Sequence, residues 1–193
     1  MTRRVALFVL LLVGACIYPQ EKLVSAVRVS MPPFLDGIPR ALAFSSSEET
    51  LPRYLEKDKD LAEVIRAFKR SLQKPTRVVR DFGEIKDDSF HLGIDIYMPI
   101  GTAVRCPFKG TITTRNGDED LGNYVVVSHG KGLYTIYGHL AAFADQHRGD
   151  QVEANEVIGY SGITGLVVDE SLHFGVLKDG LCLNPEVLLS AAK

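Results

Sequence analysis

The sequence predicts an all-β domain, an antiparallel β-sandwich or barrel-like fold that starts near residue 76 and is preceded by one N-terminal helix. From residue 76 onward, short runs of β-branched and aromatic residues alternate with Gly, Asn and Asp, which is the pattern of strands joined by turns. Apolar residues at helical spacing occur upstream, between residues 61 and 72. The chain of 193 residues is long enough for one domain with a core and a small appendage.

The composition is that of an ordinary globular protein. Hydrophobic residues make up 46% of the chain and charged residues 24%, both within the usual range. The formal net charge is -2, aromatic residues are few, and Trp is absent. The chain therefore lacks the basic field and the stacking platform on which nucleic-acid binding depends, and we predict no nucleic-acid partner.

The N-terminus has the composition of a secretory signal. Arg3 and Arg4 precede an apolar run that begins at Val5 and ends in small residues. This run is too short to cross a bilayer, which takes about 20 apolar residues. A basic start, a short apolar centre and small residues are typical of a signal peptide, so we predict one over residues 1–15. A buried N-terminal helix is the alternative.

Cys16 directly follows Gly14 and Ala15 at the end of the apolar run, and the stretch Val13-Gly14-Ala15-Cys16 resembles the lipobox of bacterial lipoproteins. The resemblance implies cleavage before Cys16, acylation of its sulfur, and an exported protein anchored by lipid to a membrane of the cell envelope, facing the periplasm. Ordinary cleavage with an incidental Cys16 is the alternative. In an exported protein the other cysteines, Cys106 and Cys182, could form a disulfide or remain two buried thiols.

Residues 16–75 are predicted to form a linker arm that ends in an amphipathic helix. Five prolines and a run of serines fall between residues 17 and 52, and proline breaks regular structure, so this stretch predicts a loosely packed arm. Asp60 and Glu63 resemble the start of a capping box, and Pro75 ends the helix. The following apolar residues form the stripe expected to pack on the next domain: Leu61, Val64, Ile65, Phe68 and Leu72.

Chemistry in the predicted β domain would depend on histidine, aspartate and serine, because the sequence has no H-E-x-x-H pair, no G-x-S-x-G elbow and no phosphate-binding glycine loop. His91 and Asp95 lie in "HLGIDIYM", where alternation places both side chains opposite the isoleucines. In an extended chain their Cα atoms would lie about 13 Å apart. A shared metal ion therefore requires a bend, and Gly93 is the position where a bulge costs least.

Two further histidines are candidates for the same site. His139 ends the predicted strand "LYTIYGHL", and His173 lies in "DESLHFGV" with Ser171 two positions earlier on the same face. From the residues alone, each histidine is either a ligand or an ordinary hydrogen-bonded histidine of a strand. A hairpin turn explains His129 in "SHGKG", and His147 has the surroundings of a solvated residue. We assign no role to these last two.

The segment from about Phe82 to Leu188 resembles the lysostaphin-type, or LytM-like, zinc endopeptidases that cut peptidoglycan cross-links. The series "HLGIDI", "GTAV", "KGTI", "GNYVVVSHGKGLYTIYGHL", "VIGYSGITG", "LHF" and "NP" keeps the order and spacing of that family. The resemblance implies a peptidase domain over residues 76–193, Zn²⁺ as the cofactor and peptidoglycan peptides as the substrate. It does not extend to the N-terminal arm and helix.

The resemblance also implies the roles of individual residues. The family's His-x-x-x-Asp ligands fall on His91 and Asp95, its third zinc ligand falls on His173, and a catalytic histidine falls on His139. Two histidines and one carboxylate with an open fourth position are the ligand set of a catalytic zinc. His139 is expected to act as an acid or base, or as a donor to the developing oxyanion.

Two positions depart from the family. Ser171 stands where the family has the first histidine of a His-x-His strand, and Gly175 stands where a glutamate often occurs. A serine hydroxyl titrates far above neutrality and cannot replace that histidine as a base. The chain is then either a slow enzyme with His139 as the base, or an inactive domain that binds the wall or regulates another wall hydrolase. Retention of all three ligand positions favours the enzyme, and the adjacent Glu170 is expected to point to the opposite face.

Overall fold

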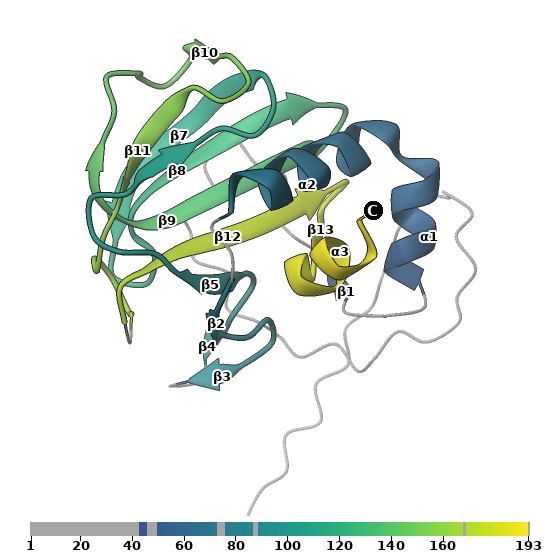
Figure 1. Cartoon of the computed structure of the whole chain (residues 1–193), viewed down its shortest axis with the longest axis horizontal. Coiled ribbons are helices and arrows are strands. Elements are labelled where there is room, and N and C mark those ends of the chain that lie inside the picture. The colour runs from purple at the N-terminus through teal and green to yellow at the C-terminus, as the bar shows by residue number, and fades with distance from the viewer. Residues whose placement is uncertain (1–42, 46–49, 73–75, 87–88, 168, 193) are drawn as a thin grey trace, which may run out of the picture.

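The structure is a computed structural model, drawn in Figure 1. The predicted signal peptide and Cys16 lie outside the residues that it describes. The structure describes residues 43–45, 50–72, 76–86, 89–167 and 169–192. Within these ranges, no helix is long and apolar enough to cross a membrane.

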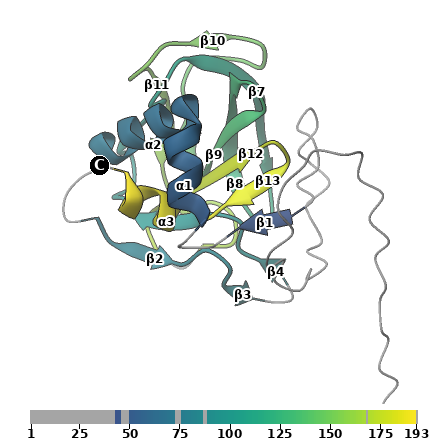
Figure 2. The ribbon, with the colours of Figure 1, turned by 90° about the vertical axis from the view of Figure 1, so that its right-hand side faces the viewer.

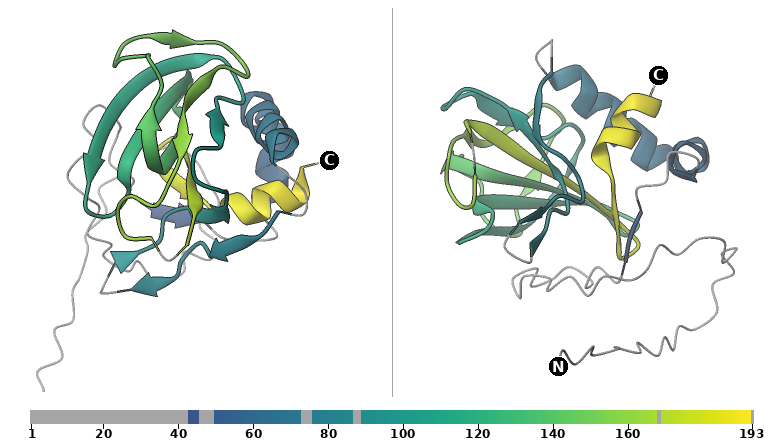
Figure 3. Two further views of the ribbon diagram at one scale, coloured as in Figure 1. Left: turned by 60° about the vertical axis from the view of Figure 1, so that its left-hand side comes forward. Right: turned by 90° about the horizontal axis from the view of Figure 1, so that it is seen from below.

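Most of the described chain forms one large β-sheet, which confirms the predicted fold class (Figures 1 and 3). Nearly all strand pairs are antiparallel, because short turns connect neighbouring strands. In chain order the strands are β1 (Ala43–Ser45), β2 (Val78–Arg80), β3 (Ile85–Lys86), β4 (Ser89–Phe90), β5 (Ile94–Tyr97), β6 (Ala103–Arg105), β7 (Gly110–Asp118), β8 (Gly122–Gly130), β9 (Leu133–Phe143), β10 (Gln151–Val152), β11 (Val157–Ser161), β12 (Ser171–Lys178) and β13 (Leu181–Leu183).

The order of strands places β12 at the centre of the fold. The main path of the sheet runs β1-β13-β12-β9-β8-β7-β10, and β5 also pairs with β12 and with β2. Strand β11 pairs with β6 and β9, so it folds back over the meander of β7, β8 and β9. The strands β3 and β4 form a separate hairpin.

The two faces of the sheet pack against different groups of residues. Along β12, Leu172, Phe174 and Val176 belong to the larger hydrophobic core, which includes the helices. Since side chains alternate along a strand, Ser171 and His173 lie on the other face. That face carries a smaller cluster of buried residues: Tyr124, Val126, Ile136, Leu177 and Cys182.

In the part of the chain that the structure describes, three helices flank the sheet: α1 (Thr50–Lys57), α2 (Lys59–Ser71) and α3 (Pro185–Ala191). Figures 1 and 2 show them gathered on one side of the molecule. The predicted helix is α2, but Asp58 caps it, because Asp58 Oδ1 accepts a hydrogen bond of 3.0 Å from the Leu61 N–H. The cap therefore lies two positions before Asp60, the residue at which the sequence predicts it.

The predicted loose arm is more ordered than its proline content suggested. Helix α1 and strand β1 both fall within it, and β1 pairs in parallel with β13. Pro52 lies in the first turn of α1, where the missing N–H has no intrahelical partner to lose. Helix α3 was not predicted either, although Asn184 caps it and Pro185 is its first residue.

Helix α2 packs on the sheet face opposite His173. The Phe68 ring stacks on the Phe174 ring with a centroid distance of 3.5 Å and an interplanar angle of 12°. Phe68 also contacts Tyr137, at a centroid distance of 6.5 Å. Because Phe174 points away from the face that carries His173, the helix buries its stripe in the core and leaves that face uncovered by α2.

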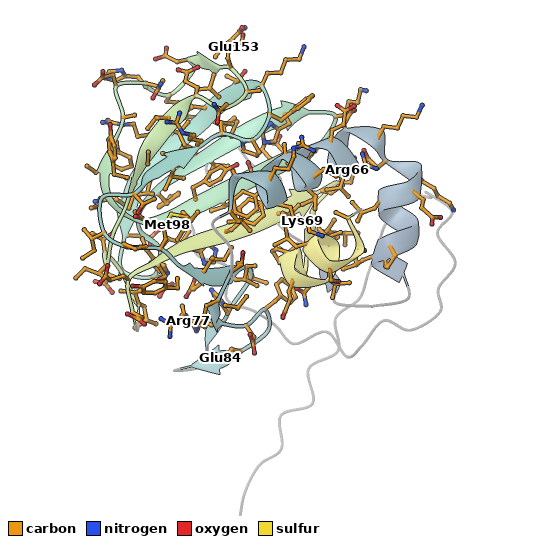
Figure 4. The ribbon with its side chains drawn as sticks, in the orientation of Figure 1. Arg66, Lys69, Arg77, Glu84, Met98 and Glu153 are labelled. Carbon is orange, nitrogen blue, oxygen red and sulfur yellow. The ribbon has the colours of Figure 1, made fainter. Side chains whose placement is uncertain are left out.

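We expect Phe68→Ala to lower the free energy of unfolding by about 3–5 kcal/mol, because the fully buried ring leaves a cavity between α2 and β12. The matched control is Arg66→Ala on the exposed side of the same helix (Figure 4), expected within about 0.5 kcal/mol of the parent. Urea denaturation measures both. A change below about 1 kcal/mol for Phe68→Ala would contradict the packing of α2 on the sheet.

The structure resolves the two alternatives for the cysteines. Cys106 and Cys182 are buried free thiols, and burial raises the pKa of each to about 12. Because the thiolate is the reactive form, we expect neither to react with a thiol reagent in the native chain from Ile17 onward. After unfolding in guanidinium both should react. Rapid modification of the native protein, or no free thiol after unfolding, would contradict this assignment.

Candidate metal centre

Strand register brings the predicted site residues together. Strands β5 and β12 are antiparallel neighbours, with Asp95 directly opposite His173. Directly opposite residues share one face of a sheet, so both side chains project on the face away from α2. On its other side His173 pairs with Gly138 of β9, and His139 follows immediately. Three strands distant in sequence therefore meet at His173.

His91 reaches the same point because the chain bends before β5. His91 and Leu92 precede the strand, and the bend lies at Gly93, where the sequence predicts it. A Cβ atom at Gly93 would lie 2.5 Å from His173 Nε2 and 2.7 Å from the Phe174 carbonyl oxygen. Gly93 is thus required by the close approach of His173, and this approach lets His91 lie beside the two strand residues.

Three ligand atoms converge at the centre. His91 Nε2 lies 3.1 Å from Asp95 Oδ1 and 3.0 Å from His173 Nδ1, and His173 Nδ1 lies 3.0 Å from Asp95 Oδ1. All three residues are buried. His139 Nε2 lies slightly further out, 3.4 Å from Asp95 Oδ1. The structure thus groups His91, Asp95 and His173 as a trio and places His139 beside it.

Backbone carbonyls determine which ring nitrogens face the centre. His91 Nδ1–H donates a hydrogen bond of 2.8 Å to the carbonyl of Asp81, and His139 Nδ1–H donates one of 2.8 Å to the carbonyl of Thr164. A carbonyl only accepts, so each neutral imidazole carries its proton on Nδ1 and its lone pair on Nε2. This is the arrangement in which a second partner orients a metal-binding histidine. Sequence reasoning missed Asp81 and Thr164, because a carbonyl acceptor has no residue-type signal.

His139 is held in an unusual backbone conformation. Its φ angle is 60°, in the left-handed region that residues other than glycine rarely adopt. Its N–H donates to the carbonyl of Leu121 at 2.7 Å, which fixes this geometry from the β7–β8 turn. Such strain persists only where surrounding contacts enforce it, and it is concentrated at functional sites.

The electrostatics of the centre favour a bound cation. Burial by itself would raise the pKa of the Asp95 carboxyl, but the three surrounding imidazoles hold that pKa well below its usual range. Burial lowers the pKa of His173 to about 4, against the attraction of Asp95, so the imidazole is neutral at pH 7. Asp95 therefore keeps its negative charge among the three rings, and that charge would attract a bound cation.

Two buried atoms at the centre support the same reading. Among the described residues, Asp95 Oδ2 and His139 Nε2 are buried without a hydrogen-bond partner, an arrangement that is costly unless another group completes it. Two histidines and one carboxylate are the donors of a catalytic zinc site. The residues present therefore fit a zinc ion held by His91, Asp95 and His173, with a fourth position left for water or substrate.

Ser171 lies next to the trio but does not point its hydroxyl at it. Its side chain is fully buried, and Ser171 Oγ–H donates to the carbonyl of Asp169 at 3.0 Å. Glu170 also turns away, because its Oε2 accepts from the Ile100 N–H at 2.8 Å. Position 171 therefore provides no base, and Glu170 serves as an anchor for the loop that follows β5.

The other two histidines lie outside the centre. His129 donates through Nδ1 to the carbonyl of Lys109 at 3.0 Å, and its Nε2 lies 2.8 Å from Thr135 Oγ1 at the β8–β9 hairpin. His147 is exposed on the loop before β10. The structure thus separates these two from the four histidine and aspartate side chains that converge.

Comparison with known proteins identifies similar sequences. Residues 89–185 match the profile of peptidase family M23. The chain is 40% identical over 95 residues to DD-carboxypeptidase/endopeptidase Mpg of Neisseria meningitidis, covering 49% of this chain and 22% of that protein. It is 36% identical over 94 residues to peptidoglycan DD-endopeptidase ShyA of Vibrio cholerae, covering 49% and 22%. Stage II sporulation protein Q of Bacillus subtilis is 36% identical over 102 residues, covering 50% and 35%.

These alignments span only 22% to 35% of the length of the relatives. Among solved structures, the catalytic domain of the prophage-encoded M23 protein EnpA from Enterococcus faecalis superposes with a TM-score of 0.52 at 26% identity, covering 60% of this chain and 92% of that one. The catalytic domain of lysostaphin from Staphylococcus simulans gives 0.53 at 24% identity, covering 64% and 96%. The lysostaphin match concerns the fold alone.

Proposed function

Because the chain belongs to peptidase family M23, we propose that it is a zinc-dependent endopeptidase that cleaves peptide cross-links of bacterial peptidoglycan. The observation that carries the proposal is the convergence of His91 Nε2, Asp95 Oδ1 and His173 Nδ1 within 3.1 Å of one another. The names of two relatives support the substrate, since both state an endopeptidase activity and one states peptidoglycan.

The chain's own residues supply a base beside the metal position. Zinc held there would polarise the scissile carbonyl and acidify water. His139 presents the lone pair of Nε2, since its Nδ1 proton is committed to the carbonyl of Thr164. His139 therefore accepts the proton of the attacking water, and its imidazolium then donates a proton toward the leaving amine. This geometry favours the base role over that of a neutral oxyanion donor.

The rate is expected to be low, because the chain has one imidazole where the resemblance implies two. A positioned general base contributes about 10²–10⁴-fold, and the Ser171 hydroxyl is turned to Asp169. The same observation favours the second candidate function, an inactive domain that binds wall peptides or regulates another wall hydrolase. The name of one relative, stage II sporulation protein Q, states no enzymatic activity.

The decisive experiment incubates the soluble chain, from Ile17 onward, with purified peptidoglycan, with and without a chelator. Mass spectrometry of the released fragments identifies new peptide ends. Chelator-sensitive cleavage supports the endopeptidase and names the bond. No cleavage by protein shown to hold one zinc would overturn the enzyme and leave the binding or regulatory function.

We also propose that the chain is exported and held by lipid to a membrane of the cell envelope. The support is the basic start, the short apolar run and the small residues before Cys16. Metabolic labelling with a radioactive fatty acid tests it, with Cys16→Ser as the control. Absence of label on the parent chain in a bacterial host would contradict the lipid anchor.

A further inference from the structure

A second row of side chains lies beside the metal trio on the same face of the sheet. The Tyr97 N–H donates to the Arg77 carbonyl at 2.8 Å, which places Arg77 opposite Tyr97, immediately before β2. On its other side Tyr97 pairs with Ser171. Directly opposite residues share a face, so Arg77, Tyr97 and Ser171 form a row two residues, or about 6.6 Å, from Asp95 and His173.

This row presents an aromatic ring and a guanidinium to solvent. The Arg77 Cζ atom lies 4.5 Å from the centre of the Tyr97 ring, and Arg77 Nη2 lies 2.8 Å from Asp169 Oδ2. The side chains of Arg77 and Asp169 are 59% and 43% exposed, and Tyr97 is 40% exposed. Figure 4 labels Arg77 beside β2, on the side of the sheet where β3 and β4 lie.

The partner of this guanidinium is exchangeable. An ion pair between two exposed side chains contributes little to stability, so Asp169 can release Arg77 at small cost. The guanidinium is a planar fork of donors that matches a carboxylate in two hydrogen bonds. The Tyr97 ring stacks on the Arg77 guanidinium and limits its motion, so the guanidinium is already positioned for a ligand. A free carboxylate on a peptide is therefore the ligand that this row fits.

We propose that Arg77 and Tyr97 form a subsite that recognises a free carboxylate of the substrate peptide, about two residues along an extended chain from the scissile bond. The proposal rests on the proposed function, and it adds Arg77, which lies just before β2 and outside the segment 89–185 that matches the family. Exposed Ile100 and Ile163 lie on the neighbouring loops and would contact the aliphatic parts of the same peptide.

The test compares two synthetic wall peptides that differ only in a free carboxylate or a carboxamide near the scissile bond. Calorimetry gives the dissociation constants, and single-turnover assays give kcat/KM. The parent chain should favour the carboxylate about tenfold in both, the size of one good charge-assisted contact. Arg77→Gln should bring the ratio to about one, and Arg77→Lys should restore part of it. Arg115→Gln on β7 removes a similar stack, on Phe143 of β9, and should leave the ratio unchanged.

Asp169→Asn distinguishes a binding role from a structural one. If Arg77 binds a carboxylate of the peptide, removing the competing carboxylate of Asp169 should raise the preference for the carboxylate peptide. Arg77→Gln should lower the same preference. If the Arg77–Asp169 ion pair only connects the segment before β2 to the loop before β12, Arg77→Gln and Asp169→Asn should weaken the binding of both peptides equally. That result would overturn the proposal. Calorimetry measures the carboxylate preference even if the chain does not cleave the peptides. A chain that binds with this preference but does not cleave would overturn the proposed function and support the subsite. Equal binding of both peptides overturns the subsite alone.

Discussion

Replacing Asp95 with asparagine is expected to abolish stoichiometric zinc binding and cleavage of peptidoglycan. Asp95 supplies the only negative charge of the trio, and its Oδ1 lies within 3.1 Å of the ligand nitrogens of both histidines. Asparagine has the same shape, so the buried side chain of β5 is replaced without a cavity. What is lost is the carboxylate that offsets the charge of a divalent cation, and neutral amide oxygens are not the usual zinc ligands.

Two measurements check this expectation. Elemental analysis after dialysis should give one zinc per parent chain and none per Asp95→Asn chain. Zinc at a hundred times its dissociation constant stabilises a protein by about 2.7 kcal/mol, so Tm should rise with zinc for the parent and not for the variant. Asp60→Asn, which neutralises a carboxylate on α2, is the control and should behave like the parent. An Asp95→Asn chain that keeps its zinc would show that the ligand set is different.

The candidate site was accessible to sequence reasoning because its residue types are distinctive. A His-x-x-x-Asp pair with a glycine between them requires a bend at one position, and the structure has that bend at Gly93. The convergence of the pair with His173 depends on the pairing of β5 with β12, which are far apart in sequence. Here the family resemblance, rather than any local pattern, indicated that the two segments meet.

The elements that were missed are those whose formation depends on distant partners. Strand β1 is stabilised by β13, more than 130 residues later, and a three-residue segment has no periodicity of its own. Pro52 was taken as a helix breaker, yet it stands in the first turn of α1, where proline is tolerated. Arg77 gave no signal because its place beside Tyr97 depends on how β2 pairs with β5.

Replacing His139 with asparagine is expected to lower kcat by about 10²–10⁴-fold while one zinc still binds. His139 Nε2 lies 3.4 Å from Asp95 Oδ1 and outside the trio, so the ligand set stays intact. Asparagine is the suitable replacement because it tolerates the left-handed backbone of this position, where φ is 60°. Steady-state kinetics on a wall peptide, with zinc analysis of the same samples, measure both effects, and His147→Asn on an exposed loop is the matched control.

The size of this loss follows from the absence of a second base. Where two imidazoles face the substrate, removal of one leaves the other to take over part of the proton transfer. In this chain the neighbouring position holds Ser171, whose hydroxyl donates to the Asp169 carbonyl. His139 then has no substitute among the described residues of the centre, and its removal should cost the full contribution of a general base. A His139→Asn chain that keeps more than about a tenth of kcat would place the base elsewhere.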